Sequence, residues 1–155
     1  SGTTTQFLAR EIMPQGNITV VTSALNVTLE LLKHKNVDVI QLGGLVRHTS
    51  SSVVGQYADG ILDNFFCSKL FLGVDGVDLE YGISTTSAQE AMLNQKMIAV
   101  AQKVIVLADS SKFGRKSFGK IADFSRIDTI ISDDIPKDYL THFDTLGIET
   151  IVCGK

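Results

Sequence analysis

Residues 18–44 read ITVVTSALNVTLELLKHKNVDVIQLGG. The β-branched run 18–22 is typical of a strand buried on both faces, and 37–42 is a second such run, closed by two glycines. Between them, 24–35 has the spacing of a helix with cationic residues at its C-terminal end, where the helix dipole favours them. The leucines expected on its buried stripe are Leu25, Leu29 and Leu32. Strand, helix and strand in this order predict a βαβ unit.

The alternation of helix and strand continues on both sides of this unit. Further helices are predicted at 4–13, 56–66, 87–102 and 136–147, and further strands at 69–74, 104–108, 128–132 and 148–152. Strands separated by helices of this length predict an α/β fold with a mostly parallel sheet and helices on both faces. The aromatic residues Phe65, Phe66 and Phe71 are expected in the core.

Composition limits the possible classes of protein. The chain has 155 residues, of which 44% are hydrophobic and 20% charged, which fits one globular domain and excludes a disordered segment. Lys and Arg number 14 against 17 Asp and Glu, a net charge of −3, so the chain alone is a poor candidate for binding DNA. Cys67 and Cys153 form no CxxC motif, which argues against a disulfide scaffold and favours a reducing cytoplasm. The uncharged stretch 12–29 contains Pro and Gly, so no membrane association is expected.

Polar loops follow the predicted parallel strands. Ligands of open α/β sheets bind beyond the carboxyl ends of the strands. Four such loops are present, at 22–26 (TSALN), 43–44 (GG), 75–78 (DGVD) and 109–112 (DSSK). Their glycines allow a ligand to approach the backbone, and their hydroxyls, amides and carboxylates suit a polyol. Ordinary α/β turns collect the same residue types, so a purely structural role for any one loop stays open.

The residues Ser1–Thr5 (SGTTT) are of types that can bind a phosphate group. A glycine and threonines at a helix N-terminus leave backbone N–H groups unpaired at the positive end of the dipole, which suits a phosphate dianion. An ordinary Ser/Thr cap is an equally good interpretation of these residues. Lys112 is a candidate for a second contact to the phosphate, and Arg47 is another candidate. The alternative is that both side chains are simply solvated, as most lysines are.

The sequence contains no recognised motif for a metal site, a Walker-type nucleotide site or a nucleophilic active site. The histidines 34, 48 and 142 have no metal-ligand spacing, so no metal site and no cofactor are expected. No GxSxG or GK[ST] motif occurs, and no histidine neighbours a plausible nucleophile. We therefore predict no catalytic residues.

Six short motifs occur in an order that resembles a known family. They are SGTTT at 1–5, VTSALN at 21–26, GGLVR at 43–47, FLGVDGVD at 71–78, GIST at 82–85 and DSSKF at 109–113. Together they resemble the C-terminal effector-sensing domain of the DeoR family of bacterial sugar-catabolism regulators, over essentially the whole chain. Residues 71–114 are most similar to the regulators of N-acetylgalactosamine and related amino-sugar pathways.

The resemblance implies an architecture and partners. Family members carry an N-terminal winged helix-turn-helix that binds operator DNA and a C-terminal domain that binds a phosphorylated sugar. The sensor fold is similar to ribose-5-phosphate isomerase and the CoA-transferase superfamily. Residues 1–155 would be one effector-sensing domain, without the helix-turn-helix and without the strand that normally precedes SGTTT. A homodimer or homotetramer is expected, because such regulators match palindromic operators.

The resemblance also implies roles for individual residues. The phosphate would be bound by Ser1, Gly2, Thr3, Thr4, Thr5 and Lys112. The sugar would be bound by Thr22, Ser23, Asn26, Gly43, Gly44, Arg47, Asp75, Gly76, Asp78, Glu90 and Asp109.

Two alternatives to a sensor follow from the same residues. The first alternative is an enzyme like ribose-5-phosphate isomerase, which has a motif similar to Asp75-Gly-Val-Asp78. In that enzyme a glycine-rich segment with a catalytic lysine follows the motif, whereas here no lysine occurs between Lys69 and Lys96. A carboxylate base could survive as Glu90, but the group that stabilises the enolate is missing, so we predict a binding protein and not an enzyme. A pure oligomerisation domain is the third interpretation, and the polar loops argue against it.

Overall fold

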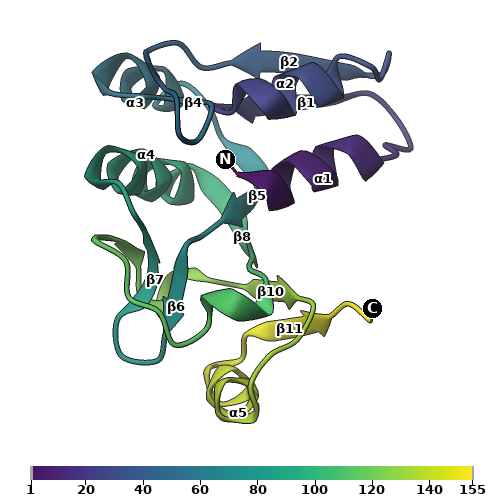
Figure 1. Cartoon of the computed structure of the whole chain (residues 1–155). Helices are drawn as coiled ribbons and strands as arrows, with labels where there is room; N and C mark the ends of the chain where they lie inside the picture. The colour runs from purple at the N-terminus through teal and green to yellow at the C-terminus, as the bar shows by residue number, and fades with distance from the viewer. Residues whose placement is uncertain (1, 155) are drawn as a thin grey trace. The chain divides into compact units, whose positions relative to one another are not determined.

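The computed structural model of the chain describes residues 2–154 (Figure 1). By its internal contacts the chain divides into two compact units, Ser1–Asn64 and Phe65–Lys155. Each is described by itself below, as the first unit and the second unit.

The first unit contains the predicted βαβ arrangement. Strand β1 (Ile18–Thr22) pairs in parallel with β2 (Val37–Gln41), and α2 (Leu25–Leu31) connects them. Helix α1 (Thr3–Glu11) packs against α2. The buried residues of this cluster are Ala9, Ala24, Val27, Leu31 and Val37.

The predicted apolar stripe of α2 is wrong. Leu29 and Leu32 are 67% and 66% exposed, and the helix ends at Leu31 and not at residue 35. The buried positions of α2 are Val27, Glu30 and Leu31. A glutamate lies at the centre of the buried side because its carboxylate is bound by side chains of α1 and by Lys33.

A hairpin follows that the sequence did not predict. Strands β3 (Leu45–Arg47) and β4 (Ser52–Val54) are antiparallel, and α3 (Gln56–Leu62) comes next, ending four residues before its predicted end. The hairpin holds the loop after β1: Val53 donates to the Ser23 carbonyl and Leu25 donates to the Ser51 carbonyl, both at 2.8 Å.

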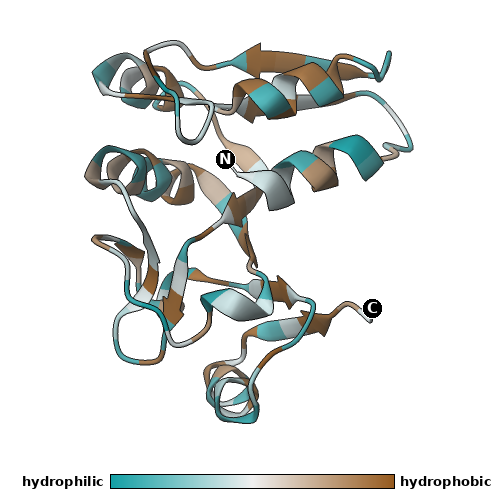
Figure 2. Cartoon of the chain, viewed as in Figure 1, coloured by the Kyte–Doolittle hydropathy of each residue, from teal (hydrophilic) through white to brown (hydrophobic). Residues whose placement is uncertain are grey.

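The second unit is built on the predicted parallel sheet. Its strand order is β11-β10-β8-β5, with every neighbouring pair parallel. The strands are β5 (Cys67–Gly73), β8 (Ala101–Leu107), β10 (Thr129–Ser132) and β11 (Glu149–Val152), and the helices are α4 (Ala88–Ala99) and α5 (Lys137–Leu146). Apolar residues dominate the strands (Figure 2). Val106, Ile130 and Phe143 are fully buried in the core of this unit.

A second, antiparallel sheet completes the second unit. It has three strands, β6 (Gly76–Asp78), β7 (Gly82–Thr85) and β9 (Gly119–Ala122), in the order β6-β7-β9. Two short 3-10 helices, Ser110–Lys112 and Phe124–Arg126, follow β8 and β9. The prediction of an α/β fold with a parallel sheet is confirmed, and the antiparallel strands are additional to it.

The aromatic residues around β5 lie differently from the prediction. Phe66 is 77% exposed, Phe71 is also exposed, and Phe65 is half-buried. Since β5 is an end strand of its four-stranded sheet, its side chains have fewer neighbours than those of β8 or β10. Among residues 2–154, no helix combines the length and apolar character that crossing a bilayer requires.

Candidate functional site

The predicted site residues fall into two sets, one in each unit. The first unit holds those at 2–5, 22–26 and 43–47, and the second unit holds those at 75–78, 90 and 109–112. Ser1, which the sequence assigns to the phosphate, lies outside the described residues.

The N-terminus of α1 has no side-chain cap among the described residues. Its N-cap is Gly2, with φ 100° and ψ 174°, a conformation that L side chains rarely adopt. The first intrahelical bond is from the Gln6 N–H to the Gly2 carbonyl, so the amides of residues 3–5 precede the helical ladder. The Thr5 hydroxyl is buried and donates to the Gly2 carbonyl at 3.0 Å, whereas Thr3 and Thr4 are exposed. Within residues 2–154, therefore, no threonine caps this helix, and the amides of residues 3–5 are suited to an anion.

The loop after β1 is ordered by its own polar groups. Thr22 is buried, and its hydroxyl accepts from the Ala24 N–H at 3.1 Å, which shapes the turn into α2. Ser23 is buried as well. Asn26 is half-buried, and its Nδ2 donates to Gln6 Oε1 at 3.1 Å. Thr22 has a structural role here, and Asn26 lies at the contact between α1 and α2.

The two glycines after β2 differ. Gly43 is exposed, and a Cβ added to it would meet nothing within 4 Å. Gly44 has φ 153°, and a Cβ there would lie 2.6 Å from the Val54 carbonyl oxygen. The close backbone of β4, and not a ligand, is sufficient to explain Gly44. Arg47 is half-buried, and its Nη2 donates to Thr49 Oγ1 at 3.2 Å.

In the second unit, Asp75 and Glu90 share a hydroxyl. Asp75 Oδ2 accepts from Thr85 Oγ1 at 2.8 Å and from the Thr86 N–H at 3.1 Å, and Thr86 Oγ1 lies 3.4 Å away. Thr85 Oγ1 also lies 3.5 Å from Glu90 Oε2, and Glu90 is only 7% exposed, in the first turn of α4. The sequence missed Thr85 and Thr86 as members of this cluster, although the motif at 82–85 contains one of them.

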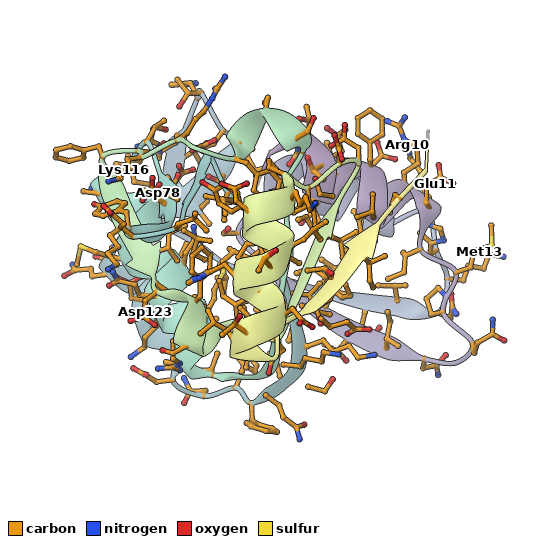
Figure 3. All side chains as sticks on the ribbon, turned by 90° about the horizontal axis from the view of Figure 1, so that it is seen from below. Arg10, Glu11, Met13, Asp78, Lys116 and Asp123 are labelled. Atoms are coloured by element: carbon orange, nitrogen blue, oxygen red, sulfur yellow. The ribbon has the colours of Figure 1, made fainter. Side chains whose placement is uncertain are left out.

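Asp78 and Gly76 belong to the β6–β7 hairpin. The Asp78 carboxylate accepts from the Tyr81 N–H at 2.8 Å and the Glu80 N–H at 3.0 Å, and Lys116 Nζ lies 3.5 Å away (Figure 3). The bond from Tyr81 is the main reason that the pKa of Asp78 is lowered. A Cβ on Gly76 would lie 2.5 Å from the Arg115 carbonyl oxygen. Backbone geometry thus explains both residues without a ligand.

Asp109 and Lys112 frame the turn after β8. The carboxylate of Asp109 accepts from the Ser111 hydroxyl and from the Ser111 N–H, and the hydroxyl is the main cause of its lowered pKa. Lys112 Nζ lies 3.8 Å from Asp109 Oδ2. Asp133, which the sequence did not single out, accepts from the Ser110 N–H at 2.6 Å. Carboxylates on two sides therefore fix this turn.

The polar loops of the second unit share one edge of the sheet. Gly73 is in register with Leu107, so the loops that begin at Asp75 and Asp109 leave neighbouring strands at the same level. In residues 2–154 no three or more His, Cys, Asp or Glu side chains are arranged to hold a metal ion.

Comparison with known proteins identifies the family. The family model described as the DeoR C terminal sensor domain matches residues 1–134. The chain belongs to this family. A protein named "Putative aga operon transcriptional repressor" from Escherichia coli O157:H7 is 43% identical over all of the chain and 58% of its own length.

Other relatives of this DeoR sensor domain are also named as regulators. The regulator GlpR of Haloferax volcanii is 34% identical over 99% of the chain and 60% of its own length. The repressor GlcR of Bacillus subtilis is 30% identical over 98% of the chain and 58% of its own length. The chain thus spans about three fifths of the curated relatives that it matches.

Proposed function

We propose that this DeoR sensor domain binds a phosphorylated sugar and is the sensing part of a transcriptional repressor of carbohydrate catabolism. The observation that carries the proposal is the N-terminus of α1, where Gly2 leaves the amides of Thr3, Thr4 and Thr5 without a side-chain cap among the described residues. Backbone amides at the positive end of a helix are a common receptor for phosphate. The resemblance of residues 71–114 to regulators of amino-sugar pathways makes amino-sugar phosphates the first ligands to test.

The further site residues are proposed from the same resemblance. As the resemblance implies, Asn26, Gly43 and Arg47 would bind the sugar, and Lys112 would be a cationic contact of the phosphate. The Asp75–Thr85–Glu90 cluster offers carboxylate acceptors that suit sugar hydroxyls. Thr22 would order the loop after β1, which contains Ser23, and Asp109 would order the turn after β8.

A sensor explains the residues better than an isomerase does. Aldose–ketose isomerisation needs a base and a group that stabilises the enolate, and no lysine occurs between Lys69 and Lys96 to supply the second. Loss of one such donor typically costs about 2.7–4 kcal/mol of transition-state stabilisation. Turnover of ribose 5-phosphate by the purified chain would contradict this part of the proposal.

The proposed mechanism is thermodynamic linkage between ligand binding and operator binding. The ligand binds one arrangement of the sensor more tightly, and this difference in affinity shifts a DNA-binding domain elsewhere in the full-length protein away from its operator. The domain itself would form a homodimer or homotetramer, which matches palindromic operators.

A thermal-shift screen tests ligand binding. The panel contains galactosamine, N-acetylgalactosamine, glucosamine and fructose 6-phosphates and ribose 5-phosphate, each beside its unphosphorylated sugar. A ligand at about 100 times its dissociation constant adds roughly 2.7 kcal/mol to the free energy of unfolding, which raises Tm by several degrees. A shift with no phosphorylated sugar, or equal shifts with the unphosphorylated ones, would overturn the proposal.

A pair of variants places the phosphate. Thr3→Asp puts a carboxylate at the amides of α1, which favours the helix by about 0.3–1 kcal/mol but repels a phosphate. Gln56→Asp is the matched control, since α3 also has a glycine N-cap, Gly55, at φ 104° and ψ 177°. We expect both variants to keep or raise Tm and only Thr3→Asp to lose the ligand. A scaffold without a ligand site would show no difference between them.

A further inference from the structure

A buried carboxylate joins α1 to α2 in the first unit. Glu30 is 7% exposed, and Val27 and Leu31 of the same helix belong to the core cluster of the first unit. Its Oε1 accepts from Gln6 Nε2 and from Arg10 Nη2, both at 3.3 Å, and its Oε2 accepts from Lys33 Nζ at 2.5 Å. Since cations compensate the charge on two sides, a buried glutamate is tolerated here. Figure 3 marks Arg10 on its helix.

This carboxylate determines the orientation of the Gln6 amide. An ionised carboxylate only accepts hydrogen bonds, so Gln6 must turn its NH₂ group toward Glu30. The three donors hold the pKa of Glu30 at about 2, with Lys33 the largest cause, so the group stays ionised near neutral pH. The carbonyl end of the Gln6 amide then faces the opposite way.

The orientation of Gln6 in turn fixes one of the two contacts that orient the Asn26 amide. Gln6 Oε1 accepts from Asn26 Nδ2 at 3.1 Å, so Asn26 must present its own NH₂ group to Gln6. Asn26 Oδ1 accepts from the Val27 N–H at 3.0 Å. A flipped Asn26 amide would place two donors, or two acceptors, against each other at both contacts. The Val27 N–H and the Gln6 carbonyl therefore favour the same orientation of Asn26, and the charge that orients Gln6 lies one helical turn further along α2.

We propose that Glu30 and Gln6 are positioning residues that fix the side-chain amide of Asn26 for the sugar part of the ligand. The inference rests on the proposed function, in which Asn26 contacts the sugar. Beyond its bonds to Gln6 and Val27, Asn26 has within residues 2–154 one further N–H and one further Oδ1 lone pair to offer a ligand, in a fixed arrangement. We call the chain of hydrogen bonds from Glu30 through Gln6 to Asn26 the relay. It selects between sugars by the hydrogen-bond donor or acceptor that they present, and it does not act on the phosphate.

Calorimetric titration of the whole chain tests the relay. The probes are inorganic phosphate and the phosphorylated sugar of the panel above that binds the unaltered chain best. Glu30→Gln is isosteric, but its amide can donate or accept, so it no longer fixes Gln6. We expect it to weaken sugar-phosphate binding about three- to tenfold, the value of one hydrogen bond, with phosphate binding unchanged within twofold. Asn26→Ala should do the same.

Two further variants separate positioning from support of the fold. Arg10→Met removes a cation and a contact between the helices but leaves the carboxylate and Gln6 in place, so both affinities should be unchanged. Gln6→Met breaks the relay without altering a charge, and it serves as the test if Glu30→Gln does not fold. The side-chain NH₂ signals of Asn26, assigned by their loss in Asn26→Ala, should shift in Glu30→Gln and Gln6→Met but not in Arg10→Met.

The outcomes distinguish the two proposals. If the unaltered chain binds no sugar phosphate of the panel, the proposed function fails and this inference fails with it. If the unaltered chain binds a sugar phosphate and Glu30→Gln binds it equally well, only the relay is overturned. If Asn26→Ala binds it equally well, the relay and the proposed contact of Asn26 with the sugar are both overturned, while sugar-phosphate binding by the domain stands. Equal weakening of sugar-phosphate and phosphate binding would also overturn it, since that result indicates a general loss of structure.

Discussion

Gly82, at the start of β7, combines two demands that only glycine meets. Its φ is 85°, and a Cβ would lie 2.2 Å from the Ala122 carbonyl oxygen of β9. We expect Gly82→Ala to lower the free energy of unfolding by at least about 2 kcal/mol, because it adds both backbone strain and a clash. Denaturant unfolding measures this. Gly60→Ala, within α3 where a Cβ meets nothing within 4 Å, should instead raise it by about 0.5–1 kcal/mol. Equal effects at the two sites would contradict the geometry.

Individual glycines also show what the sequence could and could not predict about the candidate site. The loops at 43–44 and 75–78 were found from the sequence because Gly and Asp follow apolar strands. The sequence could not show that Gly44 approaches Val54, or that Gly76 approaches Arg115 nearly forty residues away. A glycine indicates that something comes close, but only the tertiary structure shows whether it is a ligand or another part of the backbone.

At the scale of elements, Glu30 predicts how the pairing of α1 with α2 depends on pH. Its pKa is lowered from 4.5 to about 2 in the folded chain, so its contribution to stability is fully present above pH 4.5 and is lost as the pH falls toward 2. The stability difference between the unaltered chain and Glu30→Gln should therefore be constant above about pH 5.5 and shrink below pH 4.5. Urea unfolding at a series of pH values measures it. A difference that does not vary with pH would show that the charge of Glu30 is not what holds the helices together.

The start of α4 gives a second prediction for a single element. Ser87 is its N-cap, and the hydroxyl accepts from the Glu90 N–H at 3.3 Å. Ser87→Ala should lower the free energy of unfolding by about 0.5–2 kcal/mol, and Ser87→Asp should retain most of it, because either oxygen can cap the helix. Thermal unfolding of both variants is the measurement. A loss as large for Ser87→Asp as for Ser87→Ala would indicate that the hydroxyl is not acting as a cap.

The helices and strands that were predicted best are those whose own residues form a recognisable pattern. The parallel strands β1, β2, β8 and β10 are rich in Val and Ile, and Pro136 and Gly147 bound α5 as expected. The helix predicted to extend to residue 102 ends at Ala99, and β8 begins at Ala101, before its predicted start at residue 104. Strands β6, β7 and β9 have three or four residues each, too few for a period-two pattern to appear. The stripe of α2 was wrong because it was assigned to the leucines, whereas the buried side contains Glu30. The partners of Glu30 on α1, Gln6 and Arg10, lie 24 and 20 residues away along the chain, beyond any local pattern.

The charge of the whole molecule leads to a prediction about DNA. Non-specific DNA affinity comes from phosphates neutralised by Lys and Arg, and this chain has a net charge of −3. Its densest basic run, 112–120, is partly offset by acidic neighbours. Lys112 lies 3.8 Å from Asp109, and Lys116 lies 3.5 Å from both Asp78 and Glu80. Little positive field is therefore left over to attract a duplex.

We accordingly expect the 155-residue chain alone to bind labelled duplex DNA no more tightly than about 100 µM at physiological salt, the weak end of non-specific affinity. Fluorescence anisotropy at 150 mM and 50 mM salt is the measurement. Asp78→Asn with Glu80→Gln is the informative variant, because it frees Lys116 and raises the net charge by two. If charge balance is what keeps the domain off DNA, binding by this variant should strengthen as salt is lowered, and more than that of the unaltered chain. Tight, salt-sensitive binding by the unaltered chain would mean that the sensor domain itself binds DNA. The proposal that a separate domain of the full-length protein binds the operator would then be wrong.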